Sequence, residues 1–218
     1  EKKTVRVRRG EEIYEESYDK LVLSPGASPV KPPIPGMEEN HVFTLRNIPD
    51  TYAIYDFIEE HKPKTCVVVG AGFIGLEMAE NLSERGLKVT VVEGAAHVMP
   101  PIDMDMAHQV HNYIRAKGLG LCLGQTCTAM DKEGVILSDG QKIPADMVLL
   151  SIGVRPDTAF LKDSGIEMGP RGEIVVNEYM ETSAPDVYAL GDAVSTFHAV
   201  SGARTVIPLA GPANKQGR

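Results

Sequence analysis

The strongest constraint on the fold of this chain is a glycine-rich segment near its middle. An apolar run that begins at Cys66 leads directly into Gly70-Ala71-Gly72-Phe73-Ile74-Gly75, and a second apolar run closes on Glu93. The residues between the glycines and the second run have the apolar spacing of a helix. A strand, a glycine turn, a helix and a strand that ends in an acid predict a βαβ unit that binds a dinucleotide.

Each position in this segment has a physical reason. Gly70 permits the tight turn after the strand, Gly72 lets the backbone approach a pyrophosphate, and Gly75 allows the helix to pack closely on the sheet. The amino terminus of the helix favours phosphate because it carries positive partial charge. Glu93 is placed to accept hydrogen bonds from a ribose diol and would repel the additional phosphate of NADP. We therefore predict NADH as the ligand; the alternative is a glycine-rich turn in some other α/β domain.

Length, charge and cysteine content limit the remaining possibilities. The 218 residues are enough for one large or two small domains, and a formal net charge of -8 argues against a nucleic-acid partner. No apolar run reaches the length of about 20 residues that a membrane-spanning helix needs, and no signal-peptide pattern is present. The three cysteines form no Cys-x-x-Cys pair or even framework. These observations predict a cytoplasmic protein that binds neither nucleic acid nor membrane.

The rest of the chain predicts a mixed α/β organisation. Alternating residues around Gly10 indicate a hairpin, Leu21-Val-Leu indicates a buried strand, and the prolines that follow indicate a crossing segment between domains. Helical spacing predicts helices over 48–60 and 104–117. Short apolar runs predict strands over 119–123, 126–130, 135–137 and 147–152 and a β-meander appended to the parallel sheet, whose last strand ends at Gly153.

A further stretch, Val187-Tyr-Ala-Leu-Gly191-Asp192-Ala, is a short apolar strand that runs into Gly-Asp. It resembles the second flavin fingerprint of the pyridine nucleotide-disulfide oxidoreductases, the two-dinucleotide flavoprotein family. The resemblance implies that Asp192 accepts a hydrogen bond from the ribityl chain of FAD and that Gly191 admits close backbone approach.

Other motifs follow in the order of that family. Leu21-Val-Leu-Ser24-Pro25-Gly26-Ala27 is similar to the strand and turn that pass near the flavin, with Pro25 where Thr is usual. The resemblance implies that Gly153, in Ile152-Gly-Val-Arg-Pro156, borders the nicotinamide pocket. It also implies that the segment Ile207 to Ala210 approaches the isoalloxazine ring. The flavin-side residues implied are Ser24, Gly26, Gly191, Asp192, Pro208, Leu209 and Ala210.

Two residues of the glycine segment gain roles from the same resemblance. Phe73 would be the aromatic gate that covers the flavin face and moves aside for the nicotinamide. Glu77, in the first helical turn, would hold the nicotinamide carboxamide or partner a basic group near the flavin. Its alternative role is charge complementarity at the helix amino terminus.

Two parts of the family pattern are absent from these residues: the first flavin fingerprint and the redox cysteine. Cys66, Cys122 and Cys127 fall in apolar strands and are expected to be inert core thiols. His108 and His111 have no third partner, so we predict no metal site. We therefore expect no catalytic residue here, and an internal segment of a longer protein. Its predicted parts are an NAD(H) domain over 47–181 and two partial FAD-domain pieces, 1–46 and 182–218.

The function predicted for the parent protein is hydride transfer from NADH to FAD and onward to a small-molecule disulfide or persulfide. The segment from Ile207 to Arg218 resembles the coenzyme A disulfide and persulfide reductase branch, some members of which carry a rhodanese domain. Members of the family lead us to expect a homodimer. NADH oxidases and NADH peroxidases remain alternatives, and so does a non-catalytic NAD-binding module.

Overall fold

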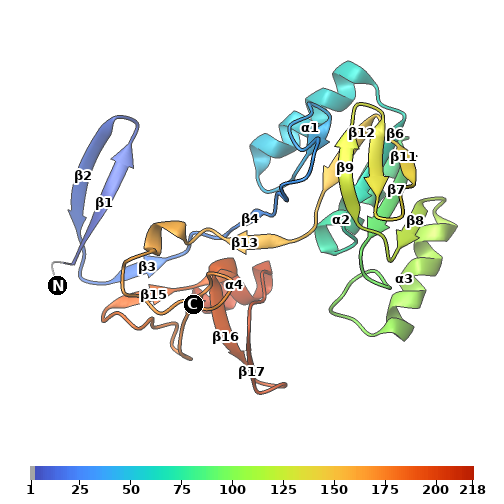
Figure 1. Cartoon of the computed structure of the whole chain (residues 1–218). Coiled ribbons are helices and arrows are strands. Elements are labelled where there is room, and N and C mark those ends of the chain that lie inside the picture. The colour runs from blue at the N-terminus through green and yellow to red at the C-terminus, as the bar shows by residue number, and fades with distance from the viewer. Residues whose placement is uncertain (1–2) are drawn as a thin grey trace. The chain divides into compact units, whose positions relative to one another are not determined.

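A computed structural model of the chain describes residues 3–218 (Figure 1). They form two compact units. One is continuous, Pro29–Val154, and the other combines the described residues up to Ser28 with Arg155–Arg218. Strands β4 (Ala27–Pro29) and β13 (Val154–Pro156), where the chain leaves and re-enters the second unit, pair in a two-stranded sheet.

The continuous unit is built on a five-stranded parallel sheet in the order β5-β12-β6-β7-β8. Its central strands are almost purely apolar because both faces of the sheet are covered. In register, Val68 of β6 lies beside Val91 of β7 on one side and Leu149 of β12 on the other. The strands are β5 (Val42–Phe43), β6 (Thr65–Val69), β7 (Lys88–Glu93), β8 (Gly120–Leu123) and β12 (Met147–Leu150).

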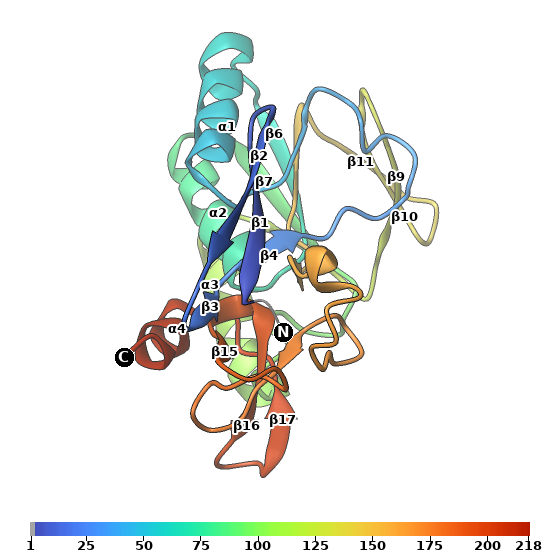
Figure 2. The ribbon, with the colours of Figure 1, turned by 90° about the vertical axis from the view of Figure 1, so that its left-hand side faces the viewer.

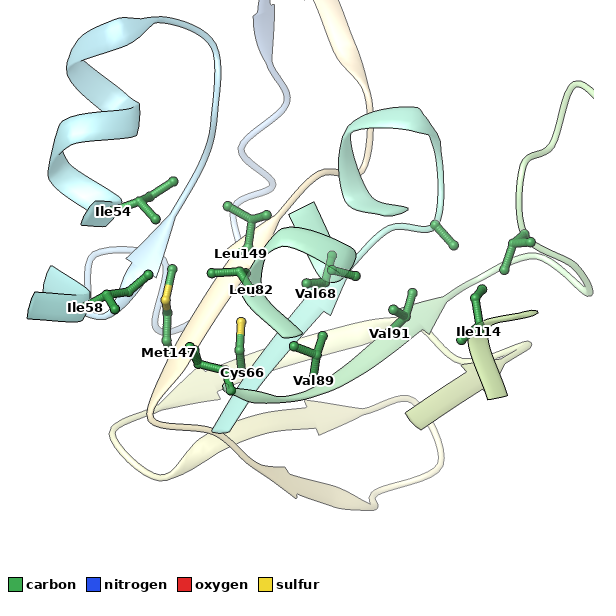
Figure 3. Packing of buried hydrophobic residues seen from close by; sticks show 14 residues of the cluster. Ile54, Ile58, Cys66, Val68, Leu82, Val89, Val91, Ile114, Met147 and Leu149 are labelled. Carbon is green, nitrogen blue, oxygen red and sulfur yellow. The ribbon is translucent and has the colours of Figure 1, made fainter. Parts of the chain in front are cut away.

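Three helices cover one face of this sheet: α1 (Ile48–His61), α2 (Phe73–Glu84) and α3 (Met104–Ala116). Alternate strand residues point to this face, where Val68 and Val91 pack with Ile54, Leu82 and Ile114 from the helices (Figure 3). Helix α1 begins where its sequence predicts, because Asn47 and Asp50 form a reciprocal capping box.

A three-stranded antiparallel meander covers the opposite face, as Figure 2 shows with α1 and α2 on the other side. It consists of β9 (Cys127–Asp131), β10 (Gly134–Leu137) and β11 (Lys142–Pro144). The remaining strand residues point here, and Val67, Val92 and Val148 pack against Met130 and Val135. The sheet is thus the middle of three layers.

One expectation about this unit is wrong, and one strand was not expected. Residues 119–123 were expected in the meander, but β8 is an edge strand of the parallel sheet, paired with β7. No strand was expected between Pro35 and Ile48, but β5 extends the sheet at its other edge. Short apolar runs carry no information about their partners, so periodicity alone does not assign them to a sheet.

The discontinuous unit begins with a hairpin of β1 (Thr4–Arg9) and β2 (Glu12–Ser17), in the register that cross-strand pairs such as Arg6 with Glu15 favour. Strand β3 (Leu21–Leu23) then pairs in parallel with β15 (Val187–Ala189). The remaining elements are β14 (Ile174–Val175), β16 (Val194–His198), β17 (Ala203–Thr205), the 3₁₀ turns η1 (Ala159–Leu161) and η2 (Gly191–Ala193), and α4 (Ala210–Gln216).

The limits of the compact units differ from the domain limits predicted at residues 47 and 181. Residues 29–46 join the continuous unit because β5 belongs to its sheet. Residues 155–181 join the other unit, where Leu161, Ile174 and Val176 share a core with Val187 and Leu23. Among residues 3–218, no helix combines the length and apolar composition that crossing a membrane requires.

Candidate dinucleotide-binding site

The glycine segment leaves β6 in a turn that only glycine fits. Gly70 has a φ of +103°, and a Cβ there would collide with the backbone carbonyl of Ser151. Its amide donates to the carbonyl of Val92 at 2.7 Å. A Cβ at Gly75 would collide with the carbonyl of Gly70 and lie 2.6 Å from the Ser151 hydroxyl oxygen. Both glycines are therefore required by the packing of the chain itself.

Gly72 differs from these two glycines. It is the N-cap residue of α2 with a φ of -80°, and a Cβ built there meets nothing within 4 Å. No side chain caps the helix at this end. The amides of the first turn of a helix have no partner within it, and they attract anions. Open space beside such amides fits the close approach of a phosphate.

Glu93 ends the next strand and faces the same loop. One carboxylate oxygen, Oε2, accepts from the backbone amide of Ala71 at 2.7 Å, and the other, Oε1, accepts from the amide of Ala95 at 2.8 Å. A carboxylate has about four acceptor positions, so these two bonds orient the group and leave capacity for a ligand.

These residues surround a cavity of about 440 Å³ at the carboxyl ends of β6, β7 and β12. That edge of an open parallel sheet is the usual position for a bound ligand. The structure brings together four of the residues expected from the sequence, Gly70, Gly72, Glu93 and Gly153. Gly153 has a φ of +121°, and its carbonyl accepts from the Val30 amide at 3.0 Å.

The cavity has further walls that the sequence motifs do not indicate. Its further lining residues are Pro32, Ile34, Val69, Val92, Gly94, Pro100, Gln125, Thr126, Cys127, Leu150, Ser151 and Ile152. Ser151 carried a usable signal, because it is a polar residue directly after the apolar strand β12. The segment 125–127 carried no such signal in the sequence, because its place in the cavity wall depends on where the meander begins relative to β8.

Other predicted residues of the segment do not line this cavity. Ala71 is fully buried, whereas Phe73 and Ile74 are 51% and 41% exposed. Glu77 lines a different groove of about 200 Å³ between α2 and α3. The roles expected for Phe73 and Glu77 remain predictions.

The flavin-side residues expected from the sequence lie in the discontinuous unit. The parallel pairing of β3 with β15 brings the carboxyl ends of both strands together, and the amide of Leu190 donates to the carbonyl of Leu23 at 3.0 Å. Ser24 and Gly191 follow directly. Gly191 has a φ of +82°, and its amide donates to the side-chain oxygen of Gln216 at 2.8 Å.

Asp192 directly follows Gly191 in the 3₁₀ turn η2. It is half-buried, and its carboxylate has no hydrogen-bond partner within residues 3–218. An acceptor left open in this way fits a hydroxyl-bearing ligand. Pro208, Leu209 and Ala210 are exposed at the start of α4, whose end is joined to Gly191 through Gln216.

Of the three cysteines, only Cys66 is a buried core thiol as the sequence predicts; Cys122 and Cys127 are half-buried, and Cys127 lines the cavity. Cys66 is 1% exposed, and burial raises the pKa of its thiol to about 12. Burial also raises the pKa of Cys127. Thiolate formation, which reactivity requires, is therefore disfavoured at both. No group of three or more metal-ligating side chains occurs in the described part of the chain.

Buried His111 supports the loop that follows Glu93. Its Nε2 accepts from the amide of Val98 at 3.2 Å, so the ring is neutral in this arrangement. Burial lowers the pKa of His111, and nearby His108, Arg115 and His97 lower it further. Met99, which follows Val98, donates its amide hydrogen bond to the carbonyl of Ala71 at 2.9 Å.

Comparison with known proteins identifies relatives along the whole chain. A model of the pyridine nucleotide-disulphide oxidoreductase family matches residues 1–217. An NADH oxidase of Methanocaldococcus jannaschii is 41% identical over 209 residues, which are 94% of this chain and 46% of that protein. A coenzyme A disulfide reductase of Staphylococcus aureus is 35% identical over 217 residues, which are 99% of this chain and 49% of that protein.

Two solved structures are similarly close. Reduced CoADR-RHD of Bacillus anthracis has a TM-score of 0.96 at 47% identity, covering 100% of this chain and 40% of that one. An NAD-dependent persulfide reductase from A. fulgidus has a TM-score of 0.95 at 37% identity, covering 99% of this chain and 41% of that one. The chain spans about half the length of the curated relatives it matches. From the match over residues 1–217 and the shared two-dinucleotide-binding fold, this chain belongs to the pyridine nucleotide-disulphide oxidoreductase family.

Proposed function

We propose that this chain is the NADH-binding part of an FAD-dependent oxidoreductase that delivers electrons to a small-molecule disulfide or persulfide such as coenzyme A disulfide. The observation that carries the proposal is the cavity where Gly70, Gly72, Glu93 and Gly153 meet. A volume of about 440 Å³ is in the range of small-molecule and cofactor sites.

Different residues of the cavity would bind different parts of NADH. The first turn of α2 would bind the diphosphate, because no side chain caps its amides and the space beside Gly72 is open. Glu93 would accept hydrogen bonds from the diol of the adenosine ribose, since its carboxylate is already held in place by two amides. Gly153, at the carboxyl end of β12, would border the nicotinamide.

The discontinuous unit supplies groups suited to FAD. Asp192 has an open acceptor for a ribityl hydroxyl, and the left-handed turns at Gly26 and Gly191 keep side chains away from the ends of β3 and β15. Ser24 and the segment Pro208 to Ala210 would complete this side. The chemistry that FAD supplies when bound is two-electron acceptance from NADH and delivery to the acceptor.

The proposal also specifies the final electron acceptor. The relatives named coenzyme A disulfide reductase and persulfide reductase support a disulfide or persulfide. The NADH oxidase of M. jannaschii and a water-forming NADH oxidase from Lactobacillus brevis favour oxygen as a second candidate. Cys66 and Cys127 have raised thiol pKa values, so neither is suited to exchange with a disulfide. A cytoplasmic homodimer remains a prediction.

Two measurements test these parts separately. Titration of the purified chain with NADH, followed by nucleotide fluorescence, should saturate at one equivalent, and absence of binding would contradict the proposal. The protein that contains this chain should oxidise NADH with coenzyme A disulfide or a persulfide. Oxidation with oxygen or peroxide alone would favour the second candidate, and NADH binding without any oxidation would favour a non-catalytic module.

A further inference from the structure

Ser151 connects the last parallel strand to the glycine turn. Its hydroxyl lies 3.0 Å from the carbonyl oxygen of Gly70 and 3.2 Å from that of Val69, and its amide donates to the Val69 carbonyl at 2.7 Å. The hydroxyl oxygen also fills the space beside Gly75, where a Cβ would lie only 2.6 Å away. One side chain thus contacts the strand, the turn and the start of α2.

The carbonyl that receives the Ser151 hydroxyl belongs to the peptide between Gly70 and Ala71. The N–H of the same peptide donates to Glu93 Oε2 at 2.7 Å. A peptide is planar and rigid, so a donor at its carbonyl and an acceptor at its amide fix its orientation from both ends. Hydrogen bonds arranged in series also polarise and strengthen one another.

We propose that Ser151 is a positioning residue that sets the orientation of the Glu93 carboxylate, and through it the preference for NADH over NADPH. The link runs from the Ser151 hydroxyl through the Gly70–Ala71 peptide to Glu93. This inference rests on the proposed NADH site. It adds a residue that binds no ribose itself but determines how the ribose-binding group is held.

The consequence is specific to one nucleotide. Loss of the hydroxyl frees the peptide to tilt, so the amide of Ala71 holds Glu93 less well and the ribose diol of NADH loses an aligned acceptor. A less firmly held Glu93 also repels a 2′-phosphate less. This gain offsets any loss of NADPH affinity that a disturbed turn would cause. A purely structural role for Ser151 would instead weaken both nucleotides equally.

The test compares Ser151→Ala with Ser83→Ala, which removes a serine hydroxyl from α2 outside the cavity. Dissociation constants for NADH and NADPH are measured on the full chain. Ser151→Ala should weaken NADH about threefold to tenfold, the range for one hydrogen bond, and change NADPH less than about twofold. Ser83→Ala should change neither. An equal loss for both nucleotides in Ser151→Ala, or no loss for either, would overturn the positioning role.

Two further measurements complete the test. Hydrogen exchange of the Ala71 amide should be faster in Ser151→Ala than in Ser83→Ala, and equal exchange would contradict the link. In a double-mutant cycle with Glu93→Gln, the effect of Ser151→Ala on the NADH-to-NADPH ratio should disappear, and additive effects would overturn the coupling. If the unsubstituted chain binds no NADH, the proposed function fails; if it binds but the ratio ignores Ser151, only this inference fails.

Discussion

The backbone amide of Ala71 donates a 2.7 Å hydrogen bond to the carboxylate of Glu93, 22 residues further along the chain. This bond joins the glycine turn after β6 to the end of β7. The residue proposed to recognise the ribose is therefore held by the turn proposed to hold the phosphates. Changes at either residue should affect both the affinity and the selectivity for nucleotides.

Glu93→Arg should reverse the nucleotide preference. The substitution removes the acceptors for the ribose diol and supplies a cation for a 2′-phosphate, so NADH affinity should fall at least about tenfold while NADPH affinity rises. Fluorescence titration with both nucleotides measures the change. Glu84→Arg, at the exposed end of α2 and outside the cavity, provides the charge-matched control. Unchanged discrimination in Glu93→Arg would disprove the ribose assignment.

Gly72→Ala should separate binding from folding. A Cβ at this position meets no other atom of the chain, so the free energy of unfolding should fall by less than about 1 kcal/mol. NADH affinity should nevertheless fall at least about tenfold if a phosphate lies against the backbone there. Gly211→Ala, where a Cβ also meets nothing, should leave NADH affinity unchanged. Normal binding by Gly72→Ala would argue against the phosphate position.

Gly75→Ala should show the opposite behaviour. Its Cβ would collide with the Gly70 carbonyl and crowd the Ser151 hydroxyl, so α2 would have to move away from the sheet. We expect a loss of about 1–3 kcal/mol in the free energy of unfolding, measured by denaturant titration. A variant as stable as the unsubstituted chain would show that the helix moves without cost.

Acidification should destabilise the chain partly through His111. Burial lowers its pKa in the folded state, so the unfolded state binds more protons at low pH. The contribution of the neutral ring is complete above the unfolded pKa of about 6.5 and is lost as pH falls toward the lower folded value. His111→Phe should flatten this part of the pH profile of unfolding, whereas exposed His61→Gln, which does not act on His111, should keep it. Identical slopes in all three proteins would rule out a role for His111.

Cys66 should resist alkylation in the folded chain. Its side chain is buried, and with a pKa of about 12 almost no thiolate exists at pH 8. Mass spectrometry after iodoacetamide treatment should find Cys66 unmodified until denaturant unfolds the chain. Half-buried Cys122 is the internal comparison. Rapid modification of Cys66 in the native chain would contradict its position in the core.

Much of the local structure followed from residue patterns. Helix α1 starts at Ile48 because Asn47 and Asp50 cap it, and both signals are readable in the sequence. The turn at Gly70 and the helix after it also lie where the glycine spacing predicts. Such features depend on residues within a few positions of each other. The placement of β8 was wrong and β5 was not expected, because a strand's neighbour is chosen by packing across the whole sheet.

By itself, the sequence determined the βαβ unit, the acid at its end and the kinship of the chain, because these depend on ordered local motifs. Only the tertiary structure decided what surrounds them. Strand β12 begins at Met147, 78 residues after Val69, the last residue of β6. The cavity exists because β12 pairs beside β6 and places Ser151 against Gly70 and Gly75. No local pattern encodes that contact, since it arises from the pairing of distant strands and the exclusion of side chains between them.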